Sequence, residues 1–440
     1  MTTGPRELVR RLLSGQRQLL TVAASLVGTQ VTTSVFGFVY WSLAARTFPV
    51  ASVGLAAAAI SAMNFLGTIG VLGLGTLLIS ELPRHPRQDW PFLTRTATIA
   101  SGAAGAAFGL VFAMLAGRFS HGLALLGATP WSALLFALGV ALTAATMVLD
   151  QAVLASGRGG LQLARNVVAS AVKTVLLVGT ALMALGSGMV IYATWTAGLL
   201  LSLWTIRRVL SGPRLRQWAD LHLLRGLGAA AGSHHALNLA LQAPTMVLPL
   251  VVAVILSPTE TAYFSTAALV CGFVSVLPFA LTIALFASSA QDETAAMERM
   301  PSTLAVAGVT STIGILVLLA SAPYVMRLFG ADYAANGVVV LRVLALGGLP
   351  LVIKDHYVAL RRVQNRTGRA ARVALVGTAF ELGAATIGGI LYGLTGVCVA
   401  WVAMLAVEAL LLTPAVAHAL HGIRPVESMR RTAGFQRGPG

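Results

Sequence analysis

Twelve apolar stretches, each long enough to form a helix that crosses a lipid bilayer, alternate with short polar segments along the chain. A membrane-crossing helix needs about 20 mainly apolar residues, and the backbone inside a bilayer must satisfy its own hydrogen bonds, which favours helices. The segments of alternating polarity that a membrane barrel needs are absent. The pattern predicts an all-α polytopic membrane protein with about twelve transmembrane helices. They are expected at residues 19–46, 52–79, 95–117, 131–155, 165–186, 188–206, 227–256, 262–289, 303–322, 337–360, 371–393 and 395–419.

Basic residues are concentrated in every second polar segment. Of the 30 lysines and arginines, three lie in the alternate segments and three inside apolar stretches, which leaves 24 on one side. The six exceptions are Arg46, Arg118, Arg327, Lys173, Arg342 and Lys354. Because lysine and arginine are retained on the cytoplasmic side of membrane proteins, this bias predicts a multi-pass protein of the bacterial inner membrane with both termini in the cytoplasm.

Composition agrees with a chain that is almost entirely membrane-embedded. Hydrophobic residues make up 57% of the 440 residues and charged residues 10%, and the mean hydropathy is +0.83, far from the values of a soluble domain. The net charge of +16 lies in short loops beside apolar stretches, where topology and anionic lipid account for it, so nucleic acid is not an expected partner. Cys271 and Cys398 lie in apolar stretches without metal or disulfide spacing.

The two halves of the chain resemble each other. The longest polar connection, residues 207–226, has six apolar stretches on either side. The turn FPVASVG after the first stretch corresponds to SPTETAY after the seventh, and LASGR before the fifth corresponds to QNRTGR before the eleventh. The halves therefore share one orientation, and parallel repeats of this kind are typical of transporters. We expect pseudo-symmetric six-helix lobes at 19–210 and 227–420, joined by a cytoplasmic linker at 211–226.

The two ends of the chain are basic. Residues 1–18 are expected to form a cytoplasmic leader that lies along the membrane, because no short apolar region with a small-residue cleavage site follows them, as a signal peptide requires. Residues 421–440 contain glycine and proline as well as arginine, which is typical of a disordered tail.

Several segments resemble those of a known family. They are the turn at 48–54, the Gly-Arg hairpin before the fifth stretch with Asn166 beyond it, the run GSHHALNLALQAP at 232–244, and the outer segment MRLFGADY at 326–333. Over about residues 15–420 the chain is similar to bacterial Wzx-type polysaccharide flippases of the multidrug/oligosaccharidyl-lipid/polysaccharide (MOP) exporter superfamily. The resemblance implies two six-helix lobes in a MATE/MOP-like V shape around a central cavity, alternating access, and no cofactor.

Charged residues inside apolar stretches are functional candidates, because they are costly in a membrane and usually face a bundle interior or a cavity. Asp150 and Lys173 lie on opposite arms of a hairpin centred near residue 160, at similar separations from its centre, so similar depth and a pair are expected. Lys354 and Glu381 form the corresponding predicted pair in the second half. The pairs either fix helix packing within each lobe or line the cavity and serve ion coupling. The acids that could serve ion coupling are Asp355, Glu381 and Glu408.

The seventh stretch has the densest cluster of uncharged polar residues. Residues 234, 238 and 242 recur at i, i+4 and i+8 and form one polar stripe. Such a stripe suits hydrogen bonding to sugar hydroxyls, and a histidine can exchange protons, but it equally suits packing between helices. The resemblance adds cavity candidates on the first two stretches, and an arginine of the tenth could attract a diphosphate or extend to lipid headgroups. The cavity candidates are Gln30, Asn64, His234, His235, Asn238, Gln242 and Arg342.

Together with the resemblance, these features predict a transporter that flips a lipid-linked (polyprenyl-diphosphate) oligosaccharide or polysaccharide repeat unit, for the synthesis of cell-surface polysaccharide such as lipopolysaccharide. A cation-coupled multidrug antiporter and a lipid II-type flippase are alternatives with the same fold. A polyprenyl-dependent membrane glycosyltransferase or polymerase is the alternative from another class. Expected partners are the lipid-linked glycan, membrane lipids and polysaccharide-assembly proteins.

The sequence offers little to the enzyme alternative. The predicted outer loops are short and contain only Glu260 and Asp332 as acids, whereas polyprenyl-dependent enzymes usually need an acidic motif in an outer loop or a sizeable outer domain. There is no phosphate-binding loop of the Walker type and no histidine constellation for a metal. We therefore expect no catalytic residue, no metal and no cofactor.

Overall fold

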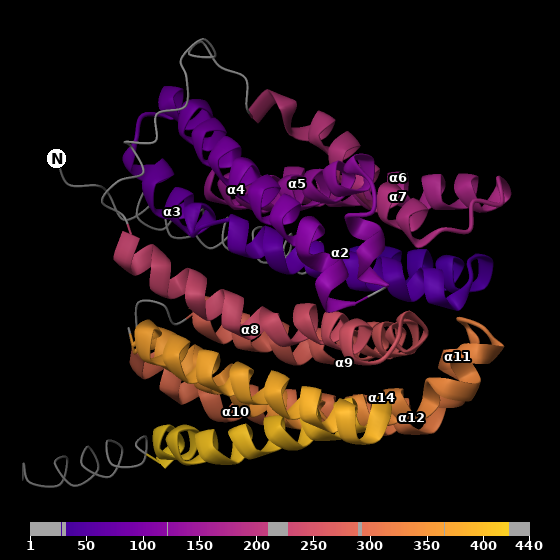
Figure 1. Cartoon of the computed structure of the whole chain (residues 1–440). Helices are drawn as coiled ribbons and strands as arrows, with labels where there is room; N and C mark the ends of the chain where they lie inside the picture. The colour runs from indigo at the N-terminus through magenta and orange to yellow at the C-terminus, as the bar shows by residue number, and fades with distance from the viewer. Residues whose placement is uncertain are drawn as a thin grey trace, which may run out of the picture.

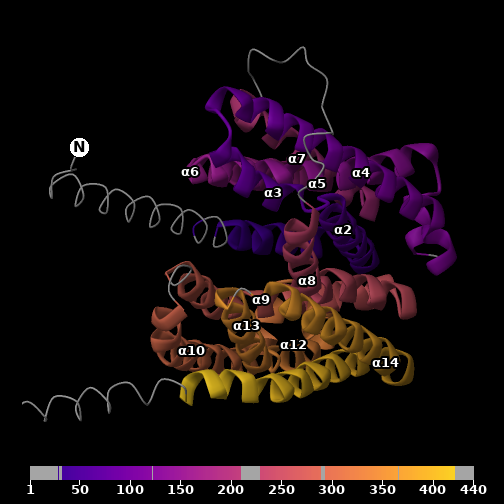
Figure 2. The same ribbon diagram turned by 90° about the vertical axis from the view of Figure 1, so that its left-hand side faces the viewer.

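A computed structural model describes residues 28, 32–120, 122–209, 228–288, 293–364 and 366–421 of the chain. Within these residues the regular structure is helical, with no strand. Figure 1 shows two helical bundles side by side, one from the N-terminal half through α7 and the other from α8 to α14. Figure 2 shows the same division from a second direction. The predicted all-α fold is confirmed. The predicted leader (1–18), the linker (211–226) and the tail beyond residue 421 lie outside the described residues.

The N-terminal bundle starts with a helix over residues 32–47. Its other α-helices are α2 (Val50–Gly70), α3 (Leu74–Glu81), α4 (Trp90–Phe119), α5 (Pro130–Ala155), α6 (Gly159–Leu182) and α7 (Gly188–Ile206). The C-terminal bundle contains α8 (Gly228–Ile255), α9 (Pro258–Ser288), α10 (Glu293–Arg327), α11 (Ala331–Asn336), α12 (Val338–Ala345), α13 (Gly348–Val363) and α14 (Thr367–His421). The long α14 is two helices that meet at the non-helical residues Tyr392 and Gly393.

The helices suit a membrane environment. Eight of the described helices are long and apolar enough to cross a bilayer. Large apolar side chains point outward from the bundles, for example Leu182 and Leu411, which are 84% and 73% exposed. An apolar outer surface of this extent marks contact with lipid. The chain is therefore a multi-pass membrane protein.

Each of the twelve predicted stretches overlaps a described helix, but the number of crossings stays a prediction. The predicted stretch 52–79 is interrupted after α2, where Leu72 and Gly73 have φ of 52° and 75°. Gly73 tolerates this left-handed conformation because it has no Cβ. The predicted stretch 337–360 is also interrupted, between α12 and α13. Both interruptions place a turn inside a stretch that the hydropathy pattern presents as continuous.

The molecule has two ends, which serve below as reference faces. The end of α3, the start of α8 and the end of α14 lie at one end, on the left in Figure 1. We call this end the linker face, because α7 ends and α8 begins on this side. The opposite end carries α11 and the turn between α6 and α7, and we call it the α11 face.

The two bundles are in direct contact at the α11 face. A Cβ on Gly54 of α2 would overlap the carbonyl oxygen of Pro258 at the start of α9, so the glycine allows two backbones to meet. Arg46 Nε donates a hydrogen bond to the carbonyl oxygen of Leu328 (2.7 Å), and Ser120 Oγ donates to that of Ala253 (3.2 Å). Each contact joins the N-terminal half to the C-terminal half. The α11 face is therefore closed between the halves.

Candidate substrate cavity between the two halves

A cavity of about 500 Å³ lies between the two bundles. This volume is within the range of small-molecule sites. The N-terminal half contributes the helix at 32–47, α2 and α7, and the C-terminal half contributes α8, α9, α12, α13 and α14. The polar and aromatic lining residues include Ser34, Trp41, Ser61, Asn64, Trp195, Thr245, Ser265, Phe264, Phe273, Ser275 and Trp401. The lining contains no lysine, arginine, aspartate or glutamate among the described residues.

Of the predicted cavity residues, Asn64 lines this cavity, and Gln30 lies outside the described residues. Arg342 does not line it. The α12 residues that do are Leu344 and Ala345. The side chain of Arg342 is exposed and its Nε donates to the carbonyl oxygen of Leu319 on α10 (3.1 Å). The structure therefore places Arg342 against α10 and not in the lining of the cavity.

The predicted polar stripe of α8 continues from the cavity toward the linker face. Thr245 lines the cavity, and its hydroxyl donates to the carbonyl oxygen of Gln242 (2.8 Å), one turn nearer the linker face. Gln242 is exposed. Asn238 is half-buried, and its Oδ1 accepts a hydrogen bond from Arg362 of α13 (2.9 Å). The stripe residues His234, Asn238 and Gln242 are not among the lining residues of the cavity, and neither is the predicted cavity residue His235.

The predicted pair between Asp150 and Lys173 is wrong. Asp150 is paired instead with Arg165 on α6, through Nε–Oδ1 at 2.7 Å and Nη2–Oδ2 at 2.5 Å. The remaining nitrogen of this guanidinium, Nη1, donates to Ser202 Oγ of α7 (3.3 Å). The fork of an arginine matches a carboxylate in this bidentate way. This buried ion pair ties α5, α6 and α7 together near the linker face.

Lys173 has a different environment. It is 9% exposed, and its Nζ lies 3.3 Å from the ring centroid of Trp195 and 5.3 Å from that of Tyr40. Such contacts are cation–π interactions. Among the described residues, none forms a salt bridge or hydrogen bond with this ammonium. Because Trp195 lines the cavity, the amino group of Lys173 lies directly behind the cavity wall.

The predicted pair of the second half, Lys354 and Glu381, is in contact in the structure. Lys354 Nζ lies 2.5 Å from Glu381 Oε1, and a second carboxylate, Glu408 Oε2, lies 2.8 Å from the same nitrogen. Trp401 Nε1 donates to Glu381 Oε2 (2.9 Å). The three charged side chains are buried. Asp355, the remaining predicted acid, forms no hydrogen bond or ion pair with a described residue.

The internal repeat relates the charge behind one wall to the charge behind the other. Lys173 is as far along the chain from the start of α6 at Gly159 as Glu381 is from the start of α14 at Thr367. Trp195 is likewise as far from the start of α7 as Trp401 is from the first residue beyond the Gly393 break. In both halves, therefore, a buried charged group contacts a tryptophan that lines the cavity.

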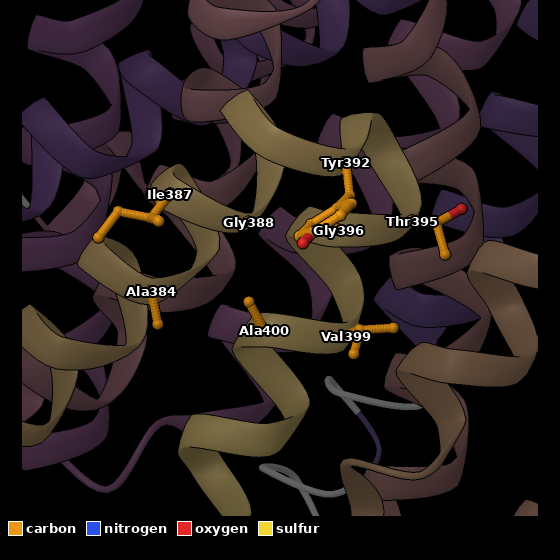
Figure 3. Close-up of a pocket in the computed structure, with 8 residues that line it drawn as sticks. All are labelled: Ala384, Ile387, Gly388, Tyr392, Thr395, Gly396, Val399 and Ala400. Carbon is orange, nitrogen blue, oxygen red and sulfur yellow. The ribbon is translucent and has the colours of Figure 1, made fainter.

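A second hollow lies within α14 and is of another kind. Figure 3 shows it between the two arms of this helix, where Gly388 and Gly396 allow close approach of their backbones. Ile387 and Tyr392 at its rim are largely exposed. The groove is lined by Ala384, Ile387, Gly388, Tyr392, Thr395, Gly396, Val399 and Ala400. Its small and apolar lining on the outer surface suits membrane lipid.

No protein-family model matches the sequence, and no curated protein matches it. Solved structures do match. The inward-facing conformation of a multidrug resistance MATE family transporter of the MOP superfamily is 14% identical, covers 91% of this chain and 99% of its own, and gives a TM-score of 0.68. An outward-facing conformation of such a transporter is 11% identical over 92% and 96% of the two chains, with a TM-score of 0.63.

A MOP superfamily transporter from Pyrococcus furiosus also has this fold. It is 14% identical over 93% of this chain and 96% of its own, with a TM-score of 0.58, and its binding pocket is described as having a reverse polarity that suggests a different function. These likenesses show the fold alone. The expected MATE/MOP-like architecture is confirmed.

Proposed function

We propose that the chain is a transporter that flips a lipid-linked oligosaccharide, carried on a polyprenyl diphosphate, by alternating access between its two halves. The cavity between two repeat-related bundles, closed at the α11 face by direct contacts between halves, supports this mechanism. Transporters with parallel repeats handle their substrate at the interface of the repeats. In this proposal the protein binds and moves its substrate and does not transform it.

The chemical nature of the residues that line the cavity supports this choice of substrate. Its described lining offers uncharged hydrogen-bonding groups and three tryptophans and contains no carboxylate. Behind it, the Lys173 ammonium has no ion partner among the described residues. A hydroxyl-rich molecule with a negative charge suits such a wall. An organic cation would need an unpaired carboxylate at the wall. The carboxylates behind Trp401, Glu381 and Glu408, are paired with Lys354, which makes a multidrug antiporter the less supported alternative. The Pyrococcus furiosus transporter has the same fold and a pocket of reverse polarity.

The contribution of Lys173 can be approximated from the geometry. Its Nζ lies 3.3 Å from the Trp195 ring centroid. An anion in van der Waals contact with the edge of that ring, about 6 Å from the centroid, would lie about 7 Å from Nζ. At the effective dielectric constant of about 20 that suits protein sites, two unit charges at this distance attract by about 2.4 kcal/mol. This is equivalent to roughly 50-fold in affinity.

The orientation of transport follows from the charge bias of the loops. We propose that the linker face is cytoplasmic, because the basic residues are concentrated there. With the α11 face closed, the substrate would then load from the cytoplasm, as expected for an inner-membrane flippase. We further propose the Lys354, Glu381 and Glu408 cluster as the place where a coupling ion acts, since it holds two acids and one base and touches the cavity through Trp401.

The test is flipping of a fluorescent polyprenyl-diphosphate oligosaccharide by the full chain in proteoliposomes, with and without an imposed proton or sodium gradient. Protein-dependent flipping is expected, and the gradient that accelerates it identifies the coupling ion. Lys173→Gln should slow flipping at subsaturating substrate by at least about tenfold, whereas Lys173→Arg keeps the charge and should retain most of the activity. Transport of cationic dyes without any flipping would contradict the proposal and favour the antiporter.

A further inference from the structure

Trp195 and Trp401 occupy equivalent positions in the two repeats and line the same cavity, one from each half of the molecule. Both side chains are half-buried. Trp41 adds a third indole on the N-terminal wall, with its ring centroid 6.1 Å from that of Trp195. Large flat apolar surfaces thus border a cavity whose other lining groups include an amide and several hydroxyls.

Each of the two tryptophans is held from behind. The Trp195 ring is in contact with the Lys173 ammonium and packs edge-to-face with Tyr40, at 5.2 Å between centroids. Trp401 donates its indole N–H to Glu381. Because this donor is already used, Trp401 can offer the cavity only its apolar ring. Both rings are therefore fixed before a ligand arrives, and a rigid surface binds with a smaller loss of conformational entropy.

Hydrogen-bonding groups of the cavity lie beside these rings. Asn64 and Ser61 project from α2 into the lining, and Ser265 does so from α9. The Ser265 hydroxyl is buried and has no hydrogen-bond partner among the described residues. Buried polar groups are almost always paired in proteins, so this hydroxyl is available to a ligand as far as the described residues are concerned.

We propose that Trp195 and Trp401 form a stacking subsite for a pyranose ring of the transported glycan. A pyranose has an apolar face of C–H groups and a rim of hydroxyls, which matches indole rings flanked by an amide and hydroxyls. An aromatic side chain supplies a large contact area of defined geometry. The subsite rests on the proposed function. In it the two tryptophans recognise the glycan, whereas Lys173 attracts the diphosphate.

The test measures binding of two lipids to the purified full chain by native mass spectrometry. The probes are undecaprenyl diphosphate and undecaprenyl diphosphate that carries one N-acetylglucosamine. The variants are Trp195→Leu and Trp401→Leu, with Trp195→Phe and Trp401→Phe retaining a ring. Trp131→Leu is the matched control, because Trp131 is 81% exposed and does not line the cavity. Melting temperatures verify that each variant is folded.

We expect each leucine variant to bind the sugar-bearing lipid about tenfold more weakly, the loss equivalent to one aromatic contact. Binding of the sugar-free lipid should change by less than about twofold, and the phenylalanine variants and Trp131→Leu should bind both lipids like the unmodified chain. Equal binding of the sugar-bearing lipid by all variants would overturn the subsite and leave the proposed function standing. Binding of neither lipid by the unmodified chain would overturn both.

A second measurement needs no variant. Hydroxyl-radical labelling of the unmodified chain reports the accessibility of individual tryptophans. The sugar-bearing lipid should protect Trp195 and Trp401 but not Trp131, and the sugar-free lipid should protect them less. Unchanged labelling of both cavity tryptophans with bound sugar-bearing lipid would refute the stacking geometry, even if the leucine variants fail to fold.

Discussion

The two lysines of the chain give a matched test of the electrostatics. Both are buried, with Lys354 4% and Lys173 9% exposed. Lys354 contacts two carboxylates. Of the described charged and aromatic side chains, Lys173 contacts only aromatic ones. Lys354→Met leaves Glu381 and Glu408 buried without their cation. Removing one member of a buried ion pair destabilises by about 3–5 kcal/mol, because the remaining charge is uncompensated.

The same substitution at Lys173 should behave differently. Lys173→Met removes a buried ammonium that has no carboxylate partner among the described residues, which relieves a desolvation penalty. The opposing loss is that of the cation–π contacts, about 0.5–2 kcal/mol. These terms oppose each other, so we expect the free energy of unfolding to change by no more than about 1 kcal/mol. The two substitutions are chemically identical, so their difference isolates the ionic partners.

The assay is reversible unfolding of the full chain in mixed micelles, followed by circular dichroism. A triple variant, Lys354→Met with Glu381→Gln and Glu408→Gln, serves as the rescue, because it removes the uncompensated charges as well as the cation. It should recover at least half of the stability lost in Lys354→Met. Equal destabilisation by the two lysine substitutions, or no recovery in the triple variant, would refute the assignment of the partners.

Three further predictions concern the contacts between helices and between halves. In double-mutant cycles on the free energy of unfolding, the effects of Asp150→Asn and Arg165→Gln should be coupled by at least about 1 kcal/mol. The effects of Asp150→Asn and Lys173→Gln should be additive. Coupling of Asp150 to Lys173 alone would contradict the observed pair. Gly54→Ala places a Cβ against the Pro258 carbonyl and should destabilise by about 1–3 kcal/mol, whereas Gly160→Ala, which meets no atom within 4 Å, should not. In oriented proteoliposomes, a membrane-impermeant maleimide should modify the cavity residue Cys271 from the linker side only. Arg46→Ala should increase modification from the α11 side. Unchanged labelling from that side would show that the Arg46 contact does not help to close the α11 face.

The sequence was sufficient to predict the class of fold, because hydropathy and loop charge report directly on membrane helices. It was less informative about contacts, as the two predicted charge pairs illustrate. The turn between α5 and α6 is centred at residue 157 rather than near 160. Lys173 is then much farther from the turn than Asp150, and the difference in depth is about 13 Å at a rise of about 1.5 Å per residue. No lysine side chain spans that distance, so Asp150 pairs with Arg165.

The second pair lies in contact because its geometry is more forgiving. The turn between α13 and α14 is centred near residue 365, and the depths of Lys354 and Glu381 measured from this turn differ by only about 8 Å. Two long side chains can bridge this offset. Glu408, which joins the cluster, comes from the far arm of α14. Its depth depends on the break at Tyr392 and Gly393, and hydropathy does not reveal where a helix turns back.

The tryptophan pair was missed for a related reason. The numbering offset between the repeats is largest at the first turn, where Pro258 corresponds to Pro49, and it is smaller where the start of α14 corresponds to that of α6. It is smaller again where the residue after the Gly393 break corresponds to the start of α7. A single offset taken from the first turn therefore does not align Trp195 with Trp401. The equivalence emerges only when positions are counted from the start of each helix, which the structure supplies and the hydropathy pattern does not.

In the proposed function, the arrangement of charge and aromatic groups separates two tasks, attraction of the substrate and its direct recognition. The ionisable side chains of Lys173 and Glu381 lie behind the wall, and the described surface in contact with the cavity contains no ionisable acid or base of the Asp, Glu, Lys or Arg type. The Lys173 ammonium behind the Trp195 ring attracts an anion over several ångströms but forms no direct ion pair that would have to be broken before release. Direct recognition is then left to indole rings and hydroxyls, whose contacts are individually weak. A carrier that must bind on one side and release on the other needs this balance, because an interaction that is equal in both states cannot drive the change between them.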